Sequence, residues 1–364
     1  MISLKNVTKR YGSASGVAVE DLSLDINRGE TVVLVGPSGC GKTTTMKMIN
    51  RLIEPTSGIL TVDGVDVLHQ DPVKLRRGIG YVIQSVGLLP HRTIAENIGT
   101  VPHLLGWDDA RIKERTGELV EMFELDPDML SRYPSELSGG QRQRVGVARA
   151  LAADPPVMLM DEPFGAVDPI VRERLQDQFL GIQESLKKTT VFVTHDIDEA
   201  IKMADRIAIL NVGGVVEQFA PPETILREPA GDFVKQFVGS ERGLKRLALI
   251  KVAGIEVEEG PVVAPGADAS GAVREMERFG FDWVSVVEDG ELLGWVDRET
   301  VDSLGRVGSE DARPFSAYVT ARNSLREALD SIVTSRTRVA VVVTEGQRYR
   351  GILTLERISK EIVL

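Results

Sequence analysis

The sequence predicts an α/β fold with a parallel sheet, followed by a smaller α+β region, and three observations support this prediction. Short apolar runs at Thr31–Val35, Val157–Met160 and Val191–Val193 alternate with helix-like stretches, as in a parallel sheet covered by helices. The first run leads into a glycine-rich loop, which marks a turn from strand to helix. After about Gly239 the pattern changes to two similar segments, which indicate a second region.

Chain length also favours more than one domain, because 364 residues exceed what one hydrophobic core usually spans. We place the first domain in residues 1–238 and a linker in residues 239–246, where Gly239–Gly243 forms a predicted hinge. Two repeats are expected to follow, in residues 247–308 and 309–364.

The two repeats have the same predicted order of elements: a helix, an apolar strand, a polar turn and a second strand that begins with glycine. In the first repeat, the helix and the two strands are Ala272–Phe279, Trp283–Val287 and Gly294–Asp297. In the second repeat, they are Leu325–Ser331, Val339–Val343 and Gly351–Thr354. The shared order indicates a duplication.

Composition and patterning exclude several classes of protein. No apolar run approaches the roughly 18 to 20 residues that cross a bilayer, so a membrane role requires a partner. The N-terminus lacks the features of a signal peptide, and we expect the chain in the cytoplasm. The single cysteine, Cys40, excludes an internal disulfide framework and a multi-cysteine metal site. A formal net charge of -11 disfavours nucleic acid as the main partner.

The glycine-rich loop has the sequence and the flanks of a phosphate-binding loop. It consists of Gly36, Pro37, Ser38, Gly39, Cys40, Gly41, Lys42, Thr43 and Thr44. Its glycines let backbone N–H groups turn towards phosphates, where a side chain would collide. We expect Lys42 to contact the β- and γ-phosphates of ATP and the Thr43 hydroxyl to hold Mg²⁺. The alternatives are a plain glycine-rich turn and, for Cys40, an inert structural thiol.

Two acidic residues end the next buried strand and define the predicted chemistry. Asp161 and Glu162 follow the apolar run Val157–Met160, so they lie at the carboxyl edge of the sheet beside the phosphate loop. Asp161 is placed to hold Mg²⁺, and Glu162 is placed to polarise the attacking water. His195, at the end of a third strand, is the expected contact of the γ-phosphate. The alternatives are solvated acids and a structural histidine.

A second glycine-containing segment, Leu137–Gln141, predicts a composite site. Ser138 can cap the helix that follows, while Gly139 and Gly140 let the first N–H groups of that helix approach an anion. The phosphate loop already supplies the contacts to the ATP of its own chain. We therefore expect this segment to reach the γ-phosphate held by a second copy of the chain. We therefore place Ser138 to Gln141 in the ATP site of a homodimer. The alternative is a flexible loop.

These motifs resemble those of the ABC transporter ATPase family over about residues 1–238. The resemblance implies a phosphate-loop NTPase of the ABC type with a helical subdomain, which hydrolyses ATP with Mg²⁺. It also implies that Tyr11 stacks on adenine, and that Gln84 touches Mg²⁺ and begins the segment that faces the membrane subunit. Ala166–Asp168 resembles the loop that signals across the dimer, with Val167 where leucine is commoner.

Several stretches resemble one branch of this family, which imports quaternary ammonium compounds such as glycine betaine, carnitine, choline and proline betaine. They are Met46–Asn50, Asp71–Arg77, Val86–His91 and Asp161–Gly165. The tail resembles the tandem CBS pair that often ends members of this branch. At Thr300 and Arg357 it departs from the CBS nucleotide pattern, where aspartate is usual. A cyclic di-AMP or ionic-strength signal near Asp297 and Thr354, or a structural role, stays open.

The resemblance implies partners as well. They are integral membrane permease subunits, a second copy of the chain and, indirectly, an extracytoplasmic substrate-binding protein, which together place the chain at the cytoplasmic face of the membrane. Three alternative functions are the ATPase of an amino-acid importer, a soluble ABC ATPase acting on ribosomes or DNA, and a nucleotide-sensing regulator. The complete catalytic set argues against the regulator. One cassette without a long coiled coil or basic arm argues against the soluble ATPase.

Overall fold

The computed structural model describes residues 1–12, 16–165, 167–315, 318–344 and 346–363. Within them the chain divides into two compact units, Met1–Ser240 and Glu241–Leu364. The boundary between the units falls inside the predicted linker. Each unit has its own hydrophobic core.

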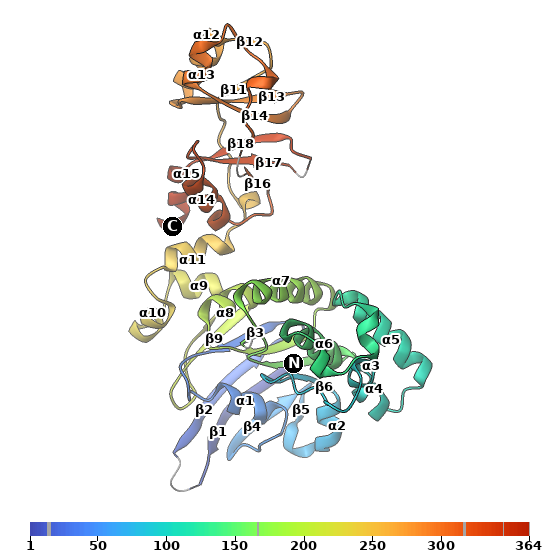
Figure 1. Cartoon of the computed structure of the whole chain (residues 1–364). Coiled ribbons are helices and arrows are strands. Elements are labelled where there is room, and N and C mark those ends of the chain that lie inside the picture. Colours follow the sequence, from blue (N-terminus) through green and yellow to red (C-terminus); the bar gives the residue numbers. More distant parts are fainter. Residues whose placement is uncertain (13–15, 166, 316–317, 345, 364) are drawn as a thin grey trace. The chain divides into compact units, whose positions relative to one another are not determined.

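A six-stranded sheet forms the centre of the first unit (Figure 1). Its order is β10-β9-β3-β8-β7-β6; the five strands from β9 to β6 are parallel, and β10 runs antiparallel to β9. The strands are β3 (Thr31–Val35), β6 (Ile79–Val82), β7 (Val157–Asp161), β8 (Thr189–Val193), β9 (Arg206–Asn211) and β10 (Val215–Ala220). Every residue of β3 and β8 is buried, as expected for strands covered on both faces. The predicted α/β fold is confirmed.

A second, antiparallel sheet belongs to the same unit, and the sequence pattern did not predict it. Its order is β2-β1-β4-β5, with β1 (Ile2–Arg10), β2 (Val17–Ile26), β4 (Ser57–Val62) and β5 (Val65–Asp66). Along β2, the buried Leu22, Leu24 and Ile26 are separated by exposed residues, as in a sheet with one face in solvent. These side chains share one core with Val32 and Met46, so the two sheets pack together.

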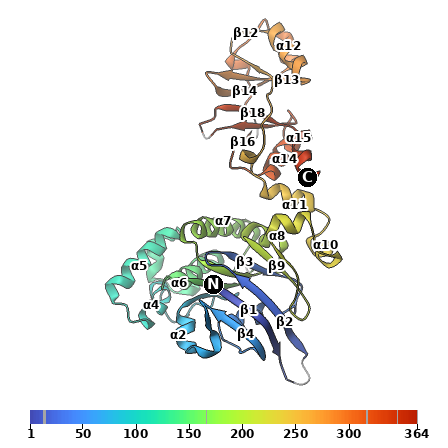
Figure 2. The same ribbon diagram turned by 180° about the vertical axis from the view of Figure 1, so that it is seen from behind.

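Helices lie beside or after the strands of the central sheet in chain order. They are α1 (Lys42–Ile49), α2 (Pro72–Arg77), α7 (Pro169–Leu186), α8 (Ile197–Met203), α9 (Pro222–Arg227) and α10 (Asp232–Val238). Between β6 and β7 the chain forms α3 (Ile94–Ile98), α4 (Thr100–Leu104), α5 (Asp109–Met122) and α6 (Gly139–Leu151). Figures 1 and 2 both show α3 to α5 on the side of the unit opposite to β1 and β2. This inserted layer corresponds to the expected helical subdomain.

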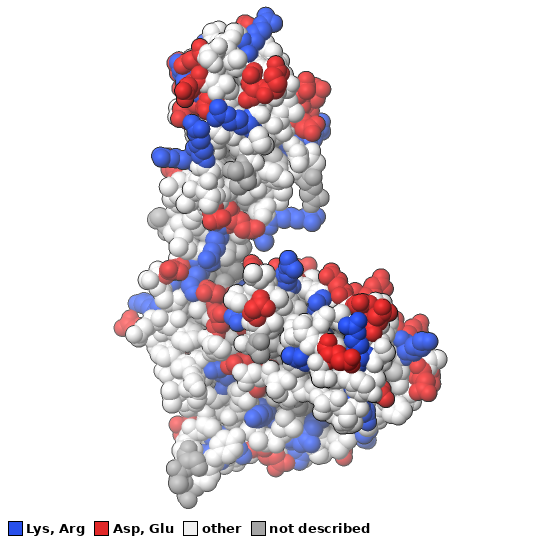
Figure 3. Space-filling view, viewed as in Figure 1, with Lys and Arg blue, Asp and Glu red and all other residues white. Residues whose placement is uncertain are grey.

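The surface of the first unit carries charges of both signs. On the face drawn in Figure 3, acidic and basic side chains are interspersed over this unit. None of the helices in the described part of the chain combines the length and the apolarity needed to cross a bilayer.

The second unit contains two repeats with matching elements. The first has β11 (Val262–Val263), α12 (Ala269–Phe279), β13 (Trp283–Glu288), β14 (Glu291–Asp297) and α13 (Arg298–Ser303). The second has β16 (Tyr318–Val319), α14 (Leu325–Thr334), β17 (Ala340–Val343), β18 (Tyr349–Leu353) and α15 (Leu355–Val363). In each, a short parallel strand is followed by a helix and an antiparallel hairpin. The first repeat adds β12 (Ala267–Asp268) paired with β15 (Arg306–Val307).

The predicted linker differs from the structure in one respect. Helix α11 (Arg242–Leu249) begins inside it and packs against α14 and α15. Leu247 and Val252 belong to the core of the second repeat, although their sequence position had placed them in the first. Arg246 is only 9% exposed and donates to the Ile362 carbonyl at 3.2 Å. An apolar helix face must be buried against a partner, and here α14 and α15 supply it.

Candidate nucleotide site

The phosphate loop lines a cavity of about 310 Å³ at the carboxyl end of β3. Its lining includes Ser38, Gly39, Gly41, Lys42, Thr43 and Thr44 of the loop, together with Ala18, Glu162 and His195. At Gly41 the backbone has φ 100°, and an added Cβ would lie 2.7 Å from the Ala18 carbonyl oxygen. A Cβ on Gly39 would instead meet nothing within 4 Å. The loop therefore packs tightly against Ala18 at Gly41 and leaves open space at Gly39, which lines the cavity.

Lys42 is buried in the loop that it belongs to. Its Nζ donates to the carbonyl oxygens of Gly36 at 2.7 Å and Pro37 at 3.0 Å, and lies 3.6 Å from Cys40 Sγ. Only 7% of Lys42 is exposed, and Cys40 is fully buried. An ammonium group beside the N-terminal end of α1 gives this site a positive potential, which suits phosphate.

Asp161 and Thr43 meet at the edge of the cavity. The Thr43 hydroxyl lies 3.1 Å from Asp161 Oδ1, which joins the start of α1 to the end of β7. Burial raises the pKa of the Asp161 carboxyl, and the hydrogen bond from Thr43 acts in the opposite direction. A hydroxyl and a carboxylate are oxygen donors of the kind that Mg²⁺ prefers, so this pair fits the predicted metal position.

Glu162 brings three loops together. Its carboxylate accepts from Gln84 Nε2 at 2.9 Å and lies 3.2 Å from His195 Nδ1, so residues following β6, β7 and β8 converge. The pattern of strand ends predicted that these residues lie close together, but it did not predict the Gln84–Glu162 or the Glu162–His195 contact. Gln84 bonds to Glu162 here, rather than to Thr43 or Asp161. The Glu162 backbone is left-handed, with φ 45°, and its N–H donates to the Val193 carbonyl at 2.9 Å. A strained backbone held by neighbours is typical of functional sites.

Ser138 caps α6 as its sequence position indicates. Its hydroxyl accepts from the Gln141 N–H at 3.3 Å, while Gln141 Oε1 accepts from the Ser138 N–H at 2.8 Å. Gly139 is exposed and has open space around it, whereas a Cβ on Gly140 would lie 2.7 Å from Val171 Cγ1 of α7. Gly140 thus allows close packing of α6 on α7, while the anion approach expected for its N–H stays a prediction. None of these residues is among the described residues lining the Lys42 cavity.

Tyr11 lies outside the described lining of that cavity. The residue is 41% exposed, and the Lys9 ammonium is 5.2 Å from its ring centroid. A cation near one face of the ring leaves the other face available for stacking. Residues 13–15, which follow Tyr11 closely, and Ala166 of the expected dimer-signalling loop lie outside the described residues.

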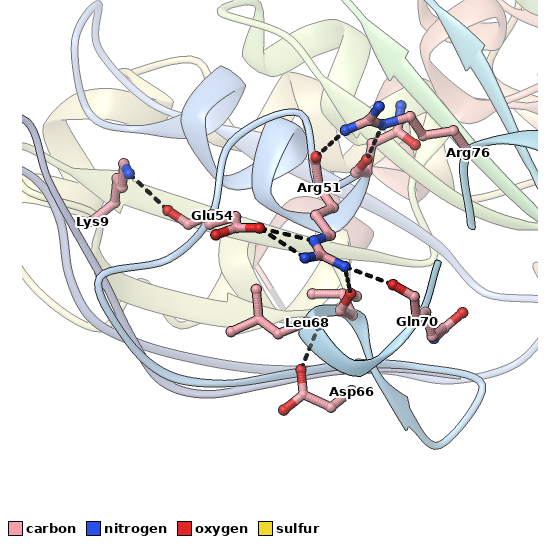
Figure 4. A network of polar contacts seen from close by, with 9 residues as sticks. Lys9, Arg51, Glu54, Asp66, Leu68, Gln70 and Arg76 are labelled. Carbon is pink, nitrogen blue, oxygen red and sulfur yellow. Dashed lines mark hydrogen bonds and ion pairs between the residues drawn. The ribbon is translucent and has the colours of Figure 1, made fainter. Parts of the chain in front are cut away.

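An arginine network fixes the far end of α1, and the sequence motifs gave no sign of it (Figure 4). Arg51 donates to the carbonyls of Val67 and Gln70 at 3.1 and 2.6 Å, and pairs with Glu54 at 2.9 Å. Arg76 of α2 donates to the Arg51 carbonyl at 2.5 Å. Helix α1 carries Lys42 and Thr43, so this network ties the phosphate loop to the segment that leads through β6 to Gln84.

Comparison with known proteins identifies the family. A family model described as ABC transporter matches residues 19–165, and one described as CBS domain matches residues 312–364. The osmoprotectant import ATP-binding protein of Salmonella typhimurium is 47% identical over 99% of this chain and 95% of its own length. The chain belongs to the family of ABC transporter ATP-binding subunits. The glycine betaine/carnitine/choline transport ATP-binding protein of Bacillus subtilis is also 47% identical, over 97% of this chain and 94% of its own.

Solved structures of ABC cassettes resemble the first unit. The dimeric structure of MJ0796, an ABC transporter cassette, has a TM-score of 0.56 and 38% identity, and covers 61% of this chain and 99% of that one. A post-hydrolysis state of the same cassette with ADP and Pi has a TM-score of 0.55 and 36% identity, with the same coverage. ATP hydrolysis coupled to transport is the activity of this ABC subunit.

In the tail of this ABC subunit, the two repeats exchange their leading segments. Glu258, before β11, bridges to Ile352 of β18, and Arg313, before β16, bridges to Trp295 of β14. The Thr354 hydroxyl donates to Glu258 Oε2 at 2.7 Å.

Asp297 is held in the same way by the other repeat. Arg313 Nη1 donates to Asp297 Oδ2 at 2.6 Å, and Arg336 lies 3.5 Å from the same oxygen. A hydrogen bond from Thr300 is the main cause that lowers the pKa of Asp297. A cavity of about 580 Å³ in this unit is lined instead by residues including Val252, Val342 and Arg350. Neither Asp297 nor Thr354, the two positions that the sequence singled out, is among its described lining residues.

Proposed function

We propose that this chain energises the import of quaternary-amine osmoprotectants, such as glycine betaine, carnitine, choline or proline betaine. The observation that carries the proposal is the similarity to two importer subunits of that type at 47% identity, which extends through the tail as well as the cassette. Similarity confined to the cassette would support transport in general. Similarity over nearly the whole length supports the branch that imports quaternary ammonium compounds.

The residues of the cavity support a division of labour in hydrolysis. Lys42 binds the β- and γ-phosphates of ATP, and Thr43, Asp161 and Gln84 hold Mg²⁺. When bound, Mg²⁺ neutralises negative charge on the phosphates. Glu162 orients and polarises the attacking water. His195, bonded to Glu162, contacts the γ-phosphate.

A second copy of the chain completes the site in this proposal. The capped end of α6 presents N–H groups near Ser138 and Gly139, which are exposed and do not line the Lys42 cavity of their own chain. An ATP molecule bound by Lys42 of one copy and Ser138 of the other joins two chains. Solved relatives that are dimeric cassettes support this arrangement.

The same proposal places the chain at the cytoplasmic face of the membrane, bound to permease subunits. An extracytoplasmic substrate-binding protein delivers the cargo, and nucleic acid is not a partner. The CBS region regulates transport in response to ionic strength or cyclic di-AMP. Its match to a CBS domain supports a regulatory role, while the internal bonds of Asp297 and Thr354 bear on where a ligand can bind.

The test is uptake by the complete transporter. The chain is purified with its membrane partners, reconstituted in vesicles with internal ATP and supplied with the binding protein. Labelled glycine betaine, carnitine and choline should accumulate, and histidine, the control cargo of an amino-acid importer, should not. Accumulation of histidine alone would show that the chain serves an amino-acid importer and would overturn the proposed cargo. Purification with ribosomes or DNA, and without membrane proteins, would overturn the transport assignment itself.

A further inference from the structure

Glu199 is a buried carboxylate close to the hydrolysis site, and none of the roles assigned above uses it. It lies in the first turn of α8, four residues after His195, and only 8% of its surface is exposed. Burial raises the pKa of its carboxyl, while bonds from Thr194 and Gln176 and the charge of Arg172 act in the opposite direction. Burying a carboxylate costs free energy unless hydrogen-bonding partners compensate for the lost water. The partners of Glu199 therefore show which segments it joins.

The partners of Glu199 come from two different segments. Gln176 of α7, which is 7% exposed, donates from Nε2 to Glu199 Oε1 at 3.0 Å. Towards His195, the Glu199 N–H donates to Asp196 Oδ1 at 3.3 Å, and the Asp196 N–H donates to the Thr194 hydroxyl at 3.0 Å. Thr194, directly before His195, also acts to lower the pKa of the Glu199 carboxyl. One residue thus joins helix α7 to the loop that carries His195.

Both of these segments lead to Glu162. Helix α7 begins after Asp168, and Arg172 in its first turns donates to the Val167 carbonyl at 3.1 Å. That bond holds the chain a few residues after Glu162. On the other side, His195 Nδ1 lies 3.2 Å from the Glu162 carboxylate. The Glu199 contact therefore closes a ring of bonded segments around Glu162.

We propose that Glu199 is a positioning residue for ATP hydrolysis and acts by holding His195 against Glu162. The inference rests on the roles proposed above for these two residues. Without the Glu199 carboxylate, Gln176 loses its partner, and the first turn of α8, directly after the His195 loop, is no longer fixed to α7. A misplacement of about 1 Å in a catalytic arrangement can cost about 10²-fold in rate. ATP binding depends on the phosphate loop and stays unchanged.

Two variants and a matched control separate positioning from general packing. Glu199→Ala should lower kcat by about 10- to 100-fold with KM for ATP nearly constant. Glu199→Gln keeps an oxygen for Gln176 and offers an amide to Thr194, so it should restore most of the rate. Lys202 of α8 also pairs with α7, through Asp177 at 2.6 Å, but this pair is partly exposed. Lys202→Ala is the control and should leave kcat within about two-fold.

A double-mutant cycle with His195→Ala tests the route of the effect. If Glu199 acts through His195, adding Glu199→Ala to His195→Ala should lower kcat by less than about two-fold further. Both kinetic constants are measured on the full chain at one fixed concentration. Gln176→Ala breaks the same bond from the α7 side. A loss of kcat equal to that of Glu199→Ala would show that the loss comes from this bond and not from misfolding of the Glu199→Ala chain.

Three results would overturn the inference. The first is a wild-type kcat in both Glu199→Ala and Gln176→Ala. The second is fully additive losses in the cycle, which would leave the roles of Glu162 and His195 intact. The third is an unchanged kcat in His195→Ala, which would remove the role proposed for His195 and the inference with it.

Discussion

The two units of the chain use their polar residues in opposite ways. In the first unit, Lys42, Thr43, Glu162 and His195 line one cavity of about 310 Å³. They follow three strands of one sheet, β3, β7 and β8. In the second unit, the polar residues at the matching turns of the two repeats are bonded within the protein. Residues that line a cavity are accessible to a ligand, whereas Asp297 and Thr354 do not line the described cavities and are bonded across the repeats.

The second unit shows this most clearly at Asp297 and Thr354. Asp297 ends β14 and Thr354 directly follows β18. Each meets a residue of the other repeat's leading segment, Arg313 at 2.6 Å and Glu258 at 2.7 Å. The two pairs have opposite polarity, since the leading segment supplies a cation in one and a carboxylate in the other. These bonds hold the repeats together. A ligand entering at either position must therefore replace an internal bond.

The largest expected effect tests the cavity of the first unit. Glu162→Gln removes the carboxylate that orients water but keeps an oxygen for Gln84 or His195. ATP hydrolysis should fall by about 10²- to 10⁴-fold, the contribution of a positioned base. ATP binding should persist, so the ATP-bound dimer should accumulate. Steady-state hydrolysis and binding of labelled ATP measure the two effects.

Glu184→Gln is the matched control for this test. Glu184 is an exposed glutamate on α7, away from the described lining of the cavity, so its replacement should leave hydrolysis unchanged. Wild-type turnover in Glu162→Gln would show that the water is oriented by another group, and the proposed role of Glu162 would be withdrawn.

A smaller effect tests whether the cavity is half of a composite site. In a mixture of Lys42→Ala and Ser138→Arg chains, each mixed dimer has one intact site and one doubly damaged site. Either variant alone should be inactive because both of its sites are damaged. Equal mixing should restore about a quarter of the wild-type rate, since about half of the dimers are mixed and each has one working site.

The composite-site hypothesis also predicts a concentration effect. Hydrolysis per wild-type chain should rise with chain concentration when membrane partners are absent, because dimerisation completes the site. Gel filtration with ATP measures the dimer fraction in parallel. A chain that stays monomeric with ATP bound and still hydrolyses at the full rate would contradict the composite site, as would a mixture no more active than its parts.

The sequence predicted the central sheet well because buried parallel strands are continuous apolar runs. The runs at β3, β7 and β8 were recognised on that basis. The antiparallel sheet was missed because register shifts between Leu4 and Arg10 break the alternation of buried and exposed residues along β1 and β2. Asn6 and Asp21 there adopt left-handed backbones, which interrupt a simple period of two.

For the site, the sequence predicted the residues but not their bonds. Strand ends placed Asp161, Glu162 and His195 along one edge. The Glu162–His195 contact and the left-handed backbone at Glu162 follow from no local motif. Arg51 and Glu199 were missed because their partners are carbonyls and side chains distant in sequence, and these pairings carry no local pattern.

The smallest expected effect tests the other side of the comparison, the tail. A chain ending at Ser240 keeps the whole first unit, with both of its sheets and every described residue that lines the ATP cavity. It should fold and hydrolyse ATP within about two-fold of the full chain, because no tail residue is needed for the proposed chemistry. Transport regulated by salt or cyclic di-AMP should lose its response.

The size of that lost response follows from how regulation acts. A regulatory unit needs only to bias an equilibrium between states, and typical couplings of about 1 to 3 kcal/mol change activity by roughly 5- to 150-fold. Uptake by vesicles with full-length and truncated chains is therefore compared while internal salt and cyclic di-AMP are varied separately. Arg313→Ala in the full chain isolates the inter-repeat bond to Asp297: if that bond transmits the signal, this variant should resemble the truncated chain. Identical responses from all three transporters would leave the tail with a structural role. The bonds of Asp297 and Thr354 between the repeats would then serve stability alone.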